Sequence, residues 1–286
     1  MNISTNNLIL NRLFTQNIFY NFLKDQYDST YYSIVQRYID NPEDKNNGEL
    51  ISEIYSFMAK SYRNEYFYQN TLLNKLLLGK HSLNTTTALT QIPIGKSKAD
   101  FILINGKAIV YEIKTELDSF DRLETQLRDY YTAFDHVCVV TSFSHYERAM
   151  TLLKDTPVGI YVLTDKNQIS KKIKKEPVIC NEYLTHTALF KILHKIEYEC
   201  IILKHFKKLP ITSQVFYYSE CLKLFSEIPI EKAYHMTLKE LKKRNRIVVK
   251  NFQQVPYELK SLVYFYKMTN NDFILLDGFL NKKFGG

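Results

Sequence analysis

Two acidic residues and a lysine lie close together in the stretch from Lys98 to Ser119, on either side of Asn105-Gly106. Asp100 comes just before the first of two short apolar runs, and Glu112 and Lys114 lie near the end of the second. Proteins hold Mg²⁺ by one or two carboxylates, and water and substrate phosphate complete its shell. Two carboxylates beside an ammonium group therefore predict a site for a divalent cation next to a phosphate.

The two apolar runs, 101–104 and 108–113, predict a β-hairpin, because Asn-Gly between β-branched runs is a strong turn signal. A two-residue turn would place Asp100 opposite Tyr111 and therefore on the other face from Glu112. A three-residue loop or a bulge, with Gly106 in the left-handed conformation, would instead place Asp100 and Glu112 on the same face. We therefore expect an odd loop here, with both carboxylates converging at one end of the hairpin.

In such a site Asp100 and Glu112 would bind the metal, and the carbonyl oxygen of Ile113 is a third candidate ligand. Lys114 would orient or activate the attacking water and offset charge on the phosphate. The alternative is that Glu112 and Lys114 are exposed strand charges and that Asp100 only begins the strand. The run AIVYEIK is apolar on both faces, as in a strand that is covered on both sides. Charged side chains in such a strand are costly to bury, which favours a functional role for Glu112 and Lys114.

Two flanking helices carry further candidates. Glu65 lies in a helix over 64–78, on the stripe shared by Tyr68, Gln69, Leu72 and Leu76; an acidic residue in a first turn also interacts favourably with the helix dipole. The helix after Ser119, its expected N-cap, carries Gln126 and Tyr130 four residues apart on one face. These two could position the attacking water or the phosphate, although a buried tyrosine with a satisfied hydroxyl is the alternative.

Asp100, the Glu112-Ile113-Lys114 motif and the Gln126…Tyr130 pair resemble the PD-(D/E)XK nuclease superfamily, in its RecB-like branch with a Q-x-x-x-Y motif. The stretches NEYFYQNTLLNKLLLGKHSLNT, SKADFILINGKAIVYEIKTELDS and RLETQLRDY are similar to the sce7726 family of bacteria and phages, which is assigned to that superfamily. The resemblance covers 62–163, and Ala99 replaces the proline of the motif. It implies a Mg²⁺- or Mn²⁺-dependent nuclease, with DNA the favoured substrate and Glu65 reaching the metal through water.

Composition and charge limit the possible domain number, partners and location of the chain. The 286 residues carry a formal charge of +8, and 45% of them are hydrophobic, which suits one large or two smaller domains and a polyanionic partner. The four cysteines are scattered and have no zinc-finger spacing, which predicts reduced thiols and a cytoplasmic location. The N-terminus lacks a secretory signal pattern, and no apolar run is long enough for a membrane helix.

The predicted fold class is α/β, with a restriction-endonuclease-like core in which a mixed sheet is flanked by helices. We expect a helical N-terminal extension at 1–60, this core at 61–170, a basic turn at 171–176 and an all-helical domain at 177–286. Strands are expected at 87–94, 136–142 and 159–163, and capping boxes at Ser144 and Thr237. The helices of the C-terminal domain are expected at 184–194, 197–208, 213–227, 231–244 and 256–268.

The C-terminal domain also bears on partners. Its basic runs, 204–208 and 239–246, could track a nucleic-acid backbone, and a solvated charged face is the alternative. A protein partner or a homodimer formed through this domain is left open. The leading prediction is a metal-dependent nuclease, and the alternative is a nucleic-acid-binding or protein-interaction factor without catalysis.

Overall fold

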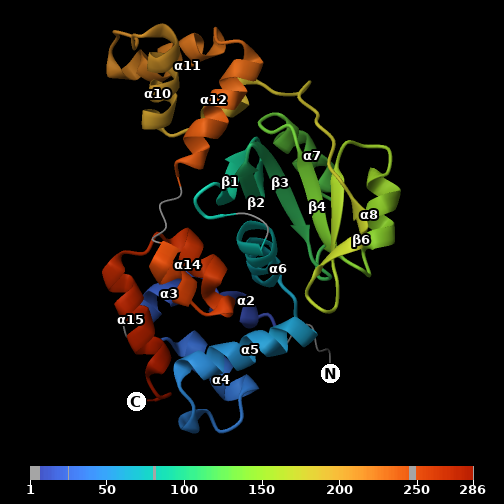
Figure 1. The fold of residues 1–286 in the computed structure, drawn as a ribbon, viewed down its shortest axis with the longest axis vertical. Helices are drawn as coiled ribbons and strands as arrows, with labels where there is room; N and C mark the ends of the chain where they lie inside the picture. The colour runs from blue at the N-terminus through green and yellow to red at the C-terminus, as the bar shows by residue number, and fades with distance from the viewer. Residues whose placement is uncertain (1–6, 25, 80–81, 245–248, 286) are drawn as a thin grey trace.

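The computed structural model describes residues 7–24, 26–79, 82–244 and 249–285. It contains a six-stranded mixed sheet flanked by helices and a helical C-terminal region, so the expected α/β class is confirmed (Figure 1). Among the described residues, no helix has the length and apolar character needed to cross a membrane. The predicted cytoplasmic location stays a prediction.

The strands are β1 (Thr87–Ile94), β2 (Ser97–Asn105), β3 (Lys107–Lys114), β4 (Val137–Ser142), β5 (Gly159–Leu163) and β6 (Ile169–Lys175). The helices before and between them are α2 (Leu10–Leu13), α3 (Gln16–Leu23), α4 (Ser29–Tyr38), η1 (Pro42–Asp44), α5 (Asn47–Ser61), α6 (Glu65–Leu72), η2 (Leu73–Leu78), α7 (Leu123–Tyr131) and α8 (Tyr146–Leu153). Those after the sheet are α9 (His186–Lys191), α10 (Lys195–Phe206), α11 (Gln214–Ser226), α12 (Ile230–Lys242), α13 (Val249–Gln254), η3 (Tyr257–Leu259), α14 (Lys260–Tyr266) and α15 (Asn270–Asn281).

The strands lie in the sheet in the order in which they occur in the chain. The first three pair antiparallel, and β3, β4 and β5 pair parallel. Parallel neighbours need a crossover, and α7 and α8 supply the two crossovers here. The expected order of a helix, three strands and two helix-strand units is therefore confirmed, and it leaves β3 in the interior of the sheet between β2 and β4.

Helices cover both faces of the sheet. Residues of α7, α8 and α9–α12 form one hydrophobic cluster with one face, which includes Ala108 and Val110 of β3. Residues of α2–α6 and of α14 and α15 pack against the other face, which includes Tyr111 and Ile113. Because side chains alternate along β3, Glu112 and Lys114 point to the face that α7 covers.

The helices after β6 divide into two groups. Figure 1 shows α10, α11 and α12 at one end of the molecule, whereas α14 and α15 lie beside the N-terminal helices at the other end. Contacts of α15 with α3 and α5, and of α14 with α6, agree with this arrangement. The first and last described parts of the chain therefore build one helical layer together. The domain boundaries expected at 60–61 and 170–177 stay a prediction.

Several local expectations were wrong. The expected basic turn at 171–176 is mostly β6, an edge strand that pairs antiparallel with β5; its lysines are typical of protected sheet edges. Two expected caps do not form: α7 begins at Leu123, well after Ser119, and α8 begins without a side-chain cap from Ser144. Thr237 does not open a helix but lies buried inside α12.

Candidate active site

The hairpin has the odd loop that the sequence predicts. Asn105 pairs with Lys107, so Gly106 alone lies between them, and its φ of 73° is in the left-handed region. Glycine adopts this conformation without strain because it has no Cβ. In the same register Phe101 lies opposite Tyr111, and the next residues along the two strands are Asp100 and Glu112. The two carboxylates therefore share a face and an end of the hairpin, and this expectation is confirmed.

Glu112 lies in a closed polar pocket beneath α7. It is 1% exposed, and three donors surround its carboxylate. Tyr130 donates its hydroxyl proton to Oε2 at 2.6 Å, the Gln126 amide donates to Oε1 at 2.5 Å, and the Lys114 ammonium lies 3.1 Å from Oε1. Burying a charge is costly unless it is paired and hydrogen-bonded, and here it is both.

Lys114 completes this cluster. Its ammonium group donates to Oε1 of Gln126 at 2.8 Å, so one glutamine amide bridges the lysine and Glu112. The Tyr130 hydroxyl also lies 2.9 Å from the carbonyl oxygen of Lys98 at the start of β2. Gln126 and Tyr130 lie on one face of α7, as the sequence predicts, and both bind the Glu112 carboxylate. Tyr130 is buried with its hydroxyl satisfied, which is the alternative given for it in the sequence analysis.

Asp100 differs from Glu112 in having one protein donor. The N–H of Ile113 donates to its Oδ2 at 2.9 Å, and the side chain is half-buried. Desolvation raises the pKa of Asp100 well above its ordinary value, and the charges of Glu112 and Glu65 raise it further. Lys114 and the Ile113 N–H act in the opposite direction and do not cancel these effects. The site thus holds more negative charge than its own donors compensate.

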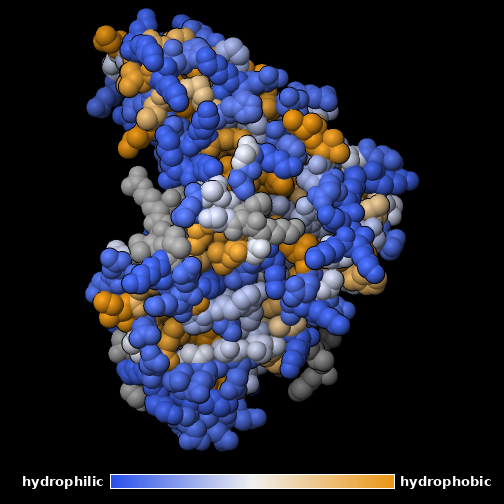
Figure 2. All heavy atoms as spheres, in the orientation of Figure 1, coloured by the Kyte–Doolittle hydropathy of each residue, from blue (hydrophilic) through white to orange (hydrophobic). Residues whose placement is uncertain are grey.

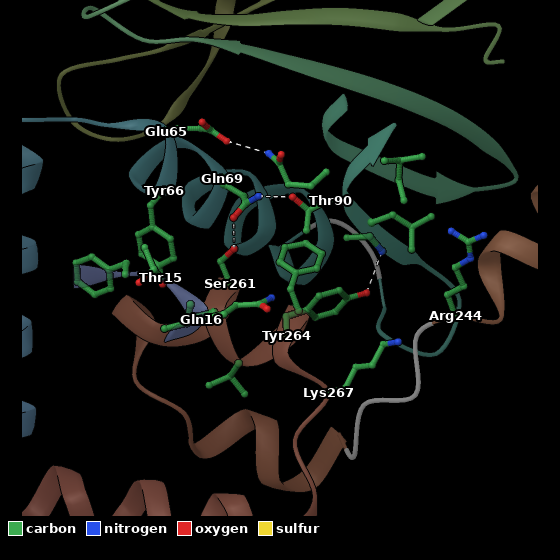
Figure 3. A pocket seen from close by; sticks show the side chains of 18 of the residues that line it. Thr15, Gln16, Glu65, Tyr66, Gln69, Thr90, Arg244, Ser261, Tyr264 and Lys267 are labelled. Atoms are coloured by element: carbon green, nitrogen blue, oxygen red, sulfur yellow. Dashed lines mark hydrogen bonds between the residues drawn. The ribbon is translucent and has the colours of Figure 1, made fainter. Parts of the chain in front are cut away.

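Glu65 approaches the same region from the first turn of α6, where the side chain of Asn64 caps the helix by accepting from the N–H of Phe67. Desolvation raises the pKa of Glu65, and the carboxylates of Asp118 and Glu112 add to the shift. Gln91 donates from its side-chain amide to Oε1 of Glu65 at 3.2 Å, as Figure 3 shows. Glu65 is therefore close enough to the two hairpin carboxylates to interact with them electrostatically, but it is exposed to solvent.

Polar side chains from three segments fix the backbone of Asp100. Thr90 on β1 donates to the Asp100 carbonyl oxygen at 2.7 Å, and Gln69 of α6 donates to the Thr90 hydroxyl at 2.6 Å. Ser261 in turn donates to Gln69 at 3.0 Å, which links α14 to the hairpin (Figure 3). Next to Thr90, Gln91 has a φ of 55°, and the β1–β2 pairing skips it. Strained backbone of this kind clusters at functional sites.

The sequence interpretation missed these supporting residues. Asp118 is another: its carboxylate accepts from both the N–H and the hydroxyl of Thr115, and so folds the loop after Lys114. Arg63 and Tyr68 hold the same loop through the carboxylate of Glu116. The T-x-x-D spacing after Lys114 could have indicated the Thr115–Asp118 turn. Nothing in the sequence pairs Arg63 with Glu116, because these contacts depend on the tertiary fold.

A large cavity of about 1570 Å³ lies beside this region. Its walls come from the edge strand β1, α6, α14 and the ends of α10 and α12, and Figure 2 shows hydrophobic residues reaching the surface in the hollow between the two groups of helices. The lining includes Glu65, Thr115 and Asp118, but none of Asp100, Glu112 and Lys114. The cavity therefore reaches the exposed carboxylates, and the polar pocket under α7 lies behind them.

The metal-binding capacity of this region is limited. Within the described ranges, no group of three or more histidine, cysteine, aspartate or glutamate side chains is arranged to hold an ion. Asp100 and Glu112 supply two carboxylates, and Ile113 contributes an N–H to Asp100. Since Mg²⁺ is commonly held by one or two carboxylates with water and phosphate around it, this donor set suits a hard cation that shares its shell with a substrate.

Comparison with known proteins identifies a family. The family model described as Bacteriophage P4 protein cII matches residues 58–271, which is most of the chain, so the chain belongs to that family. No curated protein and no solved structure gives a significant match. The predicted membership of the sce7726 family and of the PD-(D/E)XK superfamily is therefore wrong. A short set of acidic, lysine, glutamine and tyrosine residues was too little to distinguish the two families.

Proposed function

Within the Bacteriophage P4 protein cII family, we propose that this chain is a divalent-metal-dependent nuclease that hydrolyses phosphodiester bonds, with DNA the favoured substrate. One observation carries the proposal: Asp100 and Glu112 lie on one face at the same end of the hairpin, just beyond the Phe101–Tyr111 pair, with Lys114 beside Glu112. The proposed catalytic core is the sheet with α6 and α7.

The charge balance supports a cation at Asp100. Its carboxylate accepts one backbone N–H, and desolvation and the acidic neighbours raise its pKa, so a cation beside it would relieve the repulsion between the carboxylates. Asp100 and Glu112 would hold Mg²⁺ or Mn²⁺, the Ile113 carbonyl oxygen is a further ligand candidate, and Glu65 would assist through water. Such an ion would polarise a phosphoryl oxygen and favour attack by water.

The other residues have proposed roles that follow from their contacts. Lys114 is the cation nearest to Glu112, and in the proposed reaction it offsets charge that develops on the phosphate and orients the attacking water. Gln126 holds Lys114 and Glu112 at a fixed separation. Tyr130 fixes the second carboxylate oxygen and joins it to the start of β2. Gln126 and Tyr130 thus act in the proposal chiefly by positioning Glu112.

A second function has an observation in its favour. The Glu112 carboxylate is 1% exposed and already bonded by three donors, and the large cavity ends at Glu65 and Asp118. A carboxylate in such surroundings can be a structural element of a protein that binds nucleic acid or another protein without cleaving it. The two functions differ in whether Asp100 and a divalent ion are needed for a chemical change in the nucleic acid.

The test is incubation with end-labelled and circular DNA and with RNA, in Mg²⁺, in Mn²⁺ and in EDTA. The proposal predicts metal-dependent cleavage, a loss of at least about 100-fold on Asp100→Asn, and normal cleavage by the exposed-site control Asp155→Asn. Asparagine can still accept the Ile113 N–H, so the fold should persist. Intact substrates under all metal conditions, or equal cleavage by Asp100→Asn, would favour the binding protein.

A further inference from the structure

A second cavity, of about 540 Å³, lies between α10 and α12, the helices that Figure 1 shows at the end of the molecule opposite α15. It is lined by Lys204, His205, Glu231, Lys232, His235, Met236 and Lys239. Three lysines and two histidines thus face a single glutamate. Most of its wall is apolar, as expected from the methionine and the aliphatic stems of the lysines, and the charged and imidazole groups supply the polar part.

Helix geometry explains why these residues meet. Lys232, His235 and Lys239 are spaced three and four residues apart, so they lie along one face of α12. Lys204 and His205 come from the last turn of α10, which packs beside α12. The two basic runs that the sequence analysis noted, 204–208 and 239–246, therefore contribute to one surface, although they are separated by α11 in the chain.

The cavity lysines differ from their neighbours in having no acidic partner. Lys243 and Arg244, just after α12, bind Glu240 and Glu197 at 2.6 and 2.5 Å. Within the described ranges, by contrast, none of the three cavity lysines has an ion pair or a hydrogen bond. Their ammonium groups are therefore available to a ligand, and bringing them together costs electrostatic repulsion that an anion would remove.

His205 gives an independent indication. Its Nδ1 atom is buried and has no hydrogen-bond partner among the described residues. Most buried polar atoms in folded proteins are bonded, so this atom needs a partner that the described residues do not supply, such as a water molecule. The imidazole belongs to the same turn as Lys204. The unsatisfied atom and the unpaired lysines thus occur in one place.

We infer that this cavity binds backbone phosphates of a nucleic acid, with Lys204, Lys232 and Lys239 as the principal contacts. Lysine ammonium groups bind phosphate as point charges, and three of them facing one glutamate leave a net positive wall that suits a polyanion. The inference rests on the proposed function for its substrate, DNA, and adds a contact surface outside the site of cleavage. It requires no catalysis by α10 or α12.

The test measures binding of labelled single-stranded and duplex DNA in EDTA over a salt series. The charge-reversal variant K204E/K232E/K239E should bind at least about tenfold more weakly, and the slope of log affinity against log salt should fall by about 2 to 3, for three phosphate contacts. The matched control is K166E/K171E/K172E, which changes the net charge equally at exposed lysines on and before β6. It should bind within about threefold of wild type.

A triple glutamine variant at the cavity lysines, with helicity checked by circular dichroism, guards against misfolding of α12 by the reversed charges. Equal weakening in the cavity and control variants, unchanged DNA binding in the cavity variants, or cavity-dependent binding to anionic lipid vesicles in place of DNA would overturn the inference. These outcomes are separable from a failure of the nuclease proposal. If the cavity variants bind DNA more weakly than wild type in EDTA, the cavity inference is supported even if the wild-type protein cleaves nothing. If cleavage depends on Asp100, the nuclease proposal is supported even if the cavity variants bind DNA normally.

Discussion

Two clusters of charge lie on the side of the sheet that α7 covers, and they differ in how the charges are satisfied. Under α7, Glu112 and Lys114 are buried and bonded to each other and to Gln126. In the cavity between α10 and α12, Lys204 and Lys232 are exposed and unpaired within the described ranges. In the first cluster the buried charges of Glu112 and Lys114 are paired with each other, whereas the second cluster sets three lysines against a single glutamate, Glu231, and none of these lysines forms an ion pair among the described residues.

This difference distinguishes the residues on which the stability of the fold depends from those that are available to a ligand. Removing one partner of a buried ion pair leaves an uncompensated charge, which costs several kcal/mol. Removing an exposed, unpaired lysine costs the fold almost nothing. Asp100 lies between these extremes, because it is half-buried and its charge is only partly compensated. Substitutions in the two clusters should therefore separate stability from binding.

The largest effect is expected from Glu112→Ala. The change leaves the Lys114 ammonium and the Tyr130 hydroxyl without their carboxylate partner in a buried pocket. We expect a loss of about 3–5 kcal/mol in the free energy of unfolding, measured by urea denaturation. Glu124→Ala removes an exposed pair with Arg128 and serves as the control, with an expected loss of at most about 0.5 kcal/mol. Similar losses for the two variants would mean that the buried Lys114 and Tyr130 do not depend on the Glu112 carboxylate.

The next effect concerns the turn that joins β1 to β2. Gly95 has a φ of 61°, and a Cβ there would come within 2.6 Å of the Asp129 carboxylate, which accepts from Lys96 and Ser97. Gly95→Ala should therefore cost about 2–4 kcal/mol of stability, from left-handed strain and lost hydrogen bonds. Gly106→Ala meets open space and should cost about 1–2 kcal/mol. Thermal unfolding of both variants would test whether α7 holds β2 in place, and a larger loss at Gly106 would refute it.

Asp100→Asn should stabilise the metal-free protein at neutral pH. The folded-state pKa of Asp100 is raised, so its contribution to stability is full below the ordinary value of 3.8 and is lost as pH rises through the folded-state pKa. The variant should gain about 2–4 °C in Tm for each kcal/mol of relieved repulsion at pH 8, and nothing below pH of about 4. Differential scanning calorimetry in EDTA across this pH range would measure it. A lower Tm for the variant at pH 8 would contradict the raised pKa.

The smallest effect is expected at the basic cavity. Lys232→Ala should change the free energy of unfolding by less than about 0.5 kcal/mol, since the side chain is exposed and has no ion-pair partner among the described residues. Urea denaturation is again the measurement. A loss above about 1 kcal/mol would mean that the cavity lysines have a structural role, and the contrast between the two clusters would disappear.

Features that depend on local chain geometry could be predicted from the sequence. The Asn105-Gly106 pair identified the hairpin, and the parity of its strands identified the odd loop, because Gly106 alone tolerates the left-handed conformation there. The spacing of Gln126 and Tyr130 placed both on one face of α7, and that face covers β3. In each case the relevant distance along the chain is short.

Other features could not be predicted because distant segments determine them. The edge strand β6 looked like a basic turn, since its four lysines come in two adjacent pairs around one isoleucine and its partner strand is β5. The hydrogen bonds that run from Ser261 through Gln69 and Thr90 to Asp100 join residues far apart in the sequence. The family resemblance failed because it relied on a few residue types that are common in many proteins.

Mn²⁺ titration followed by electron paramagnetic resonance would show whether Asp100 and Glu112 hold a divalent cation. We predict binding of Mn²⁺ by the wild-type protein, weaker at low pH because the cation competes with the proton on Asp100, and loss of that binding in Asp100→Asn while Asp155→Asn retains it. Absence of Mn²⁺ binding by the wild-type protein, or equal binding by Asp100→Asn, would contradict the account.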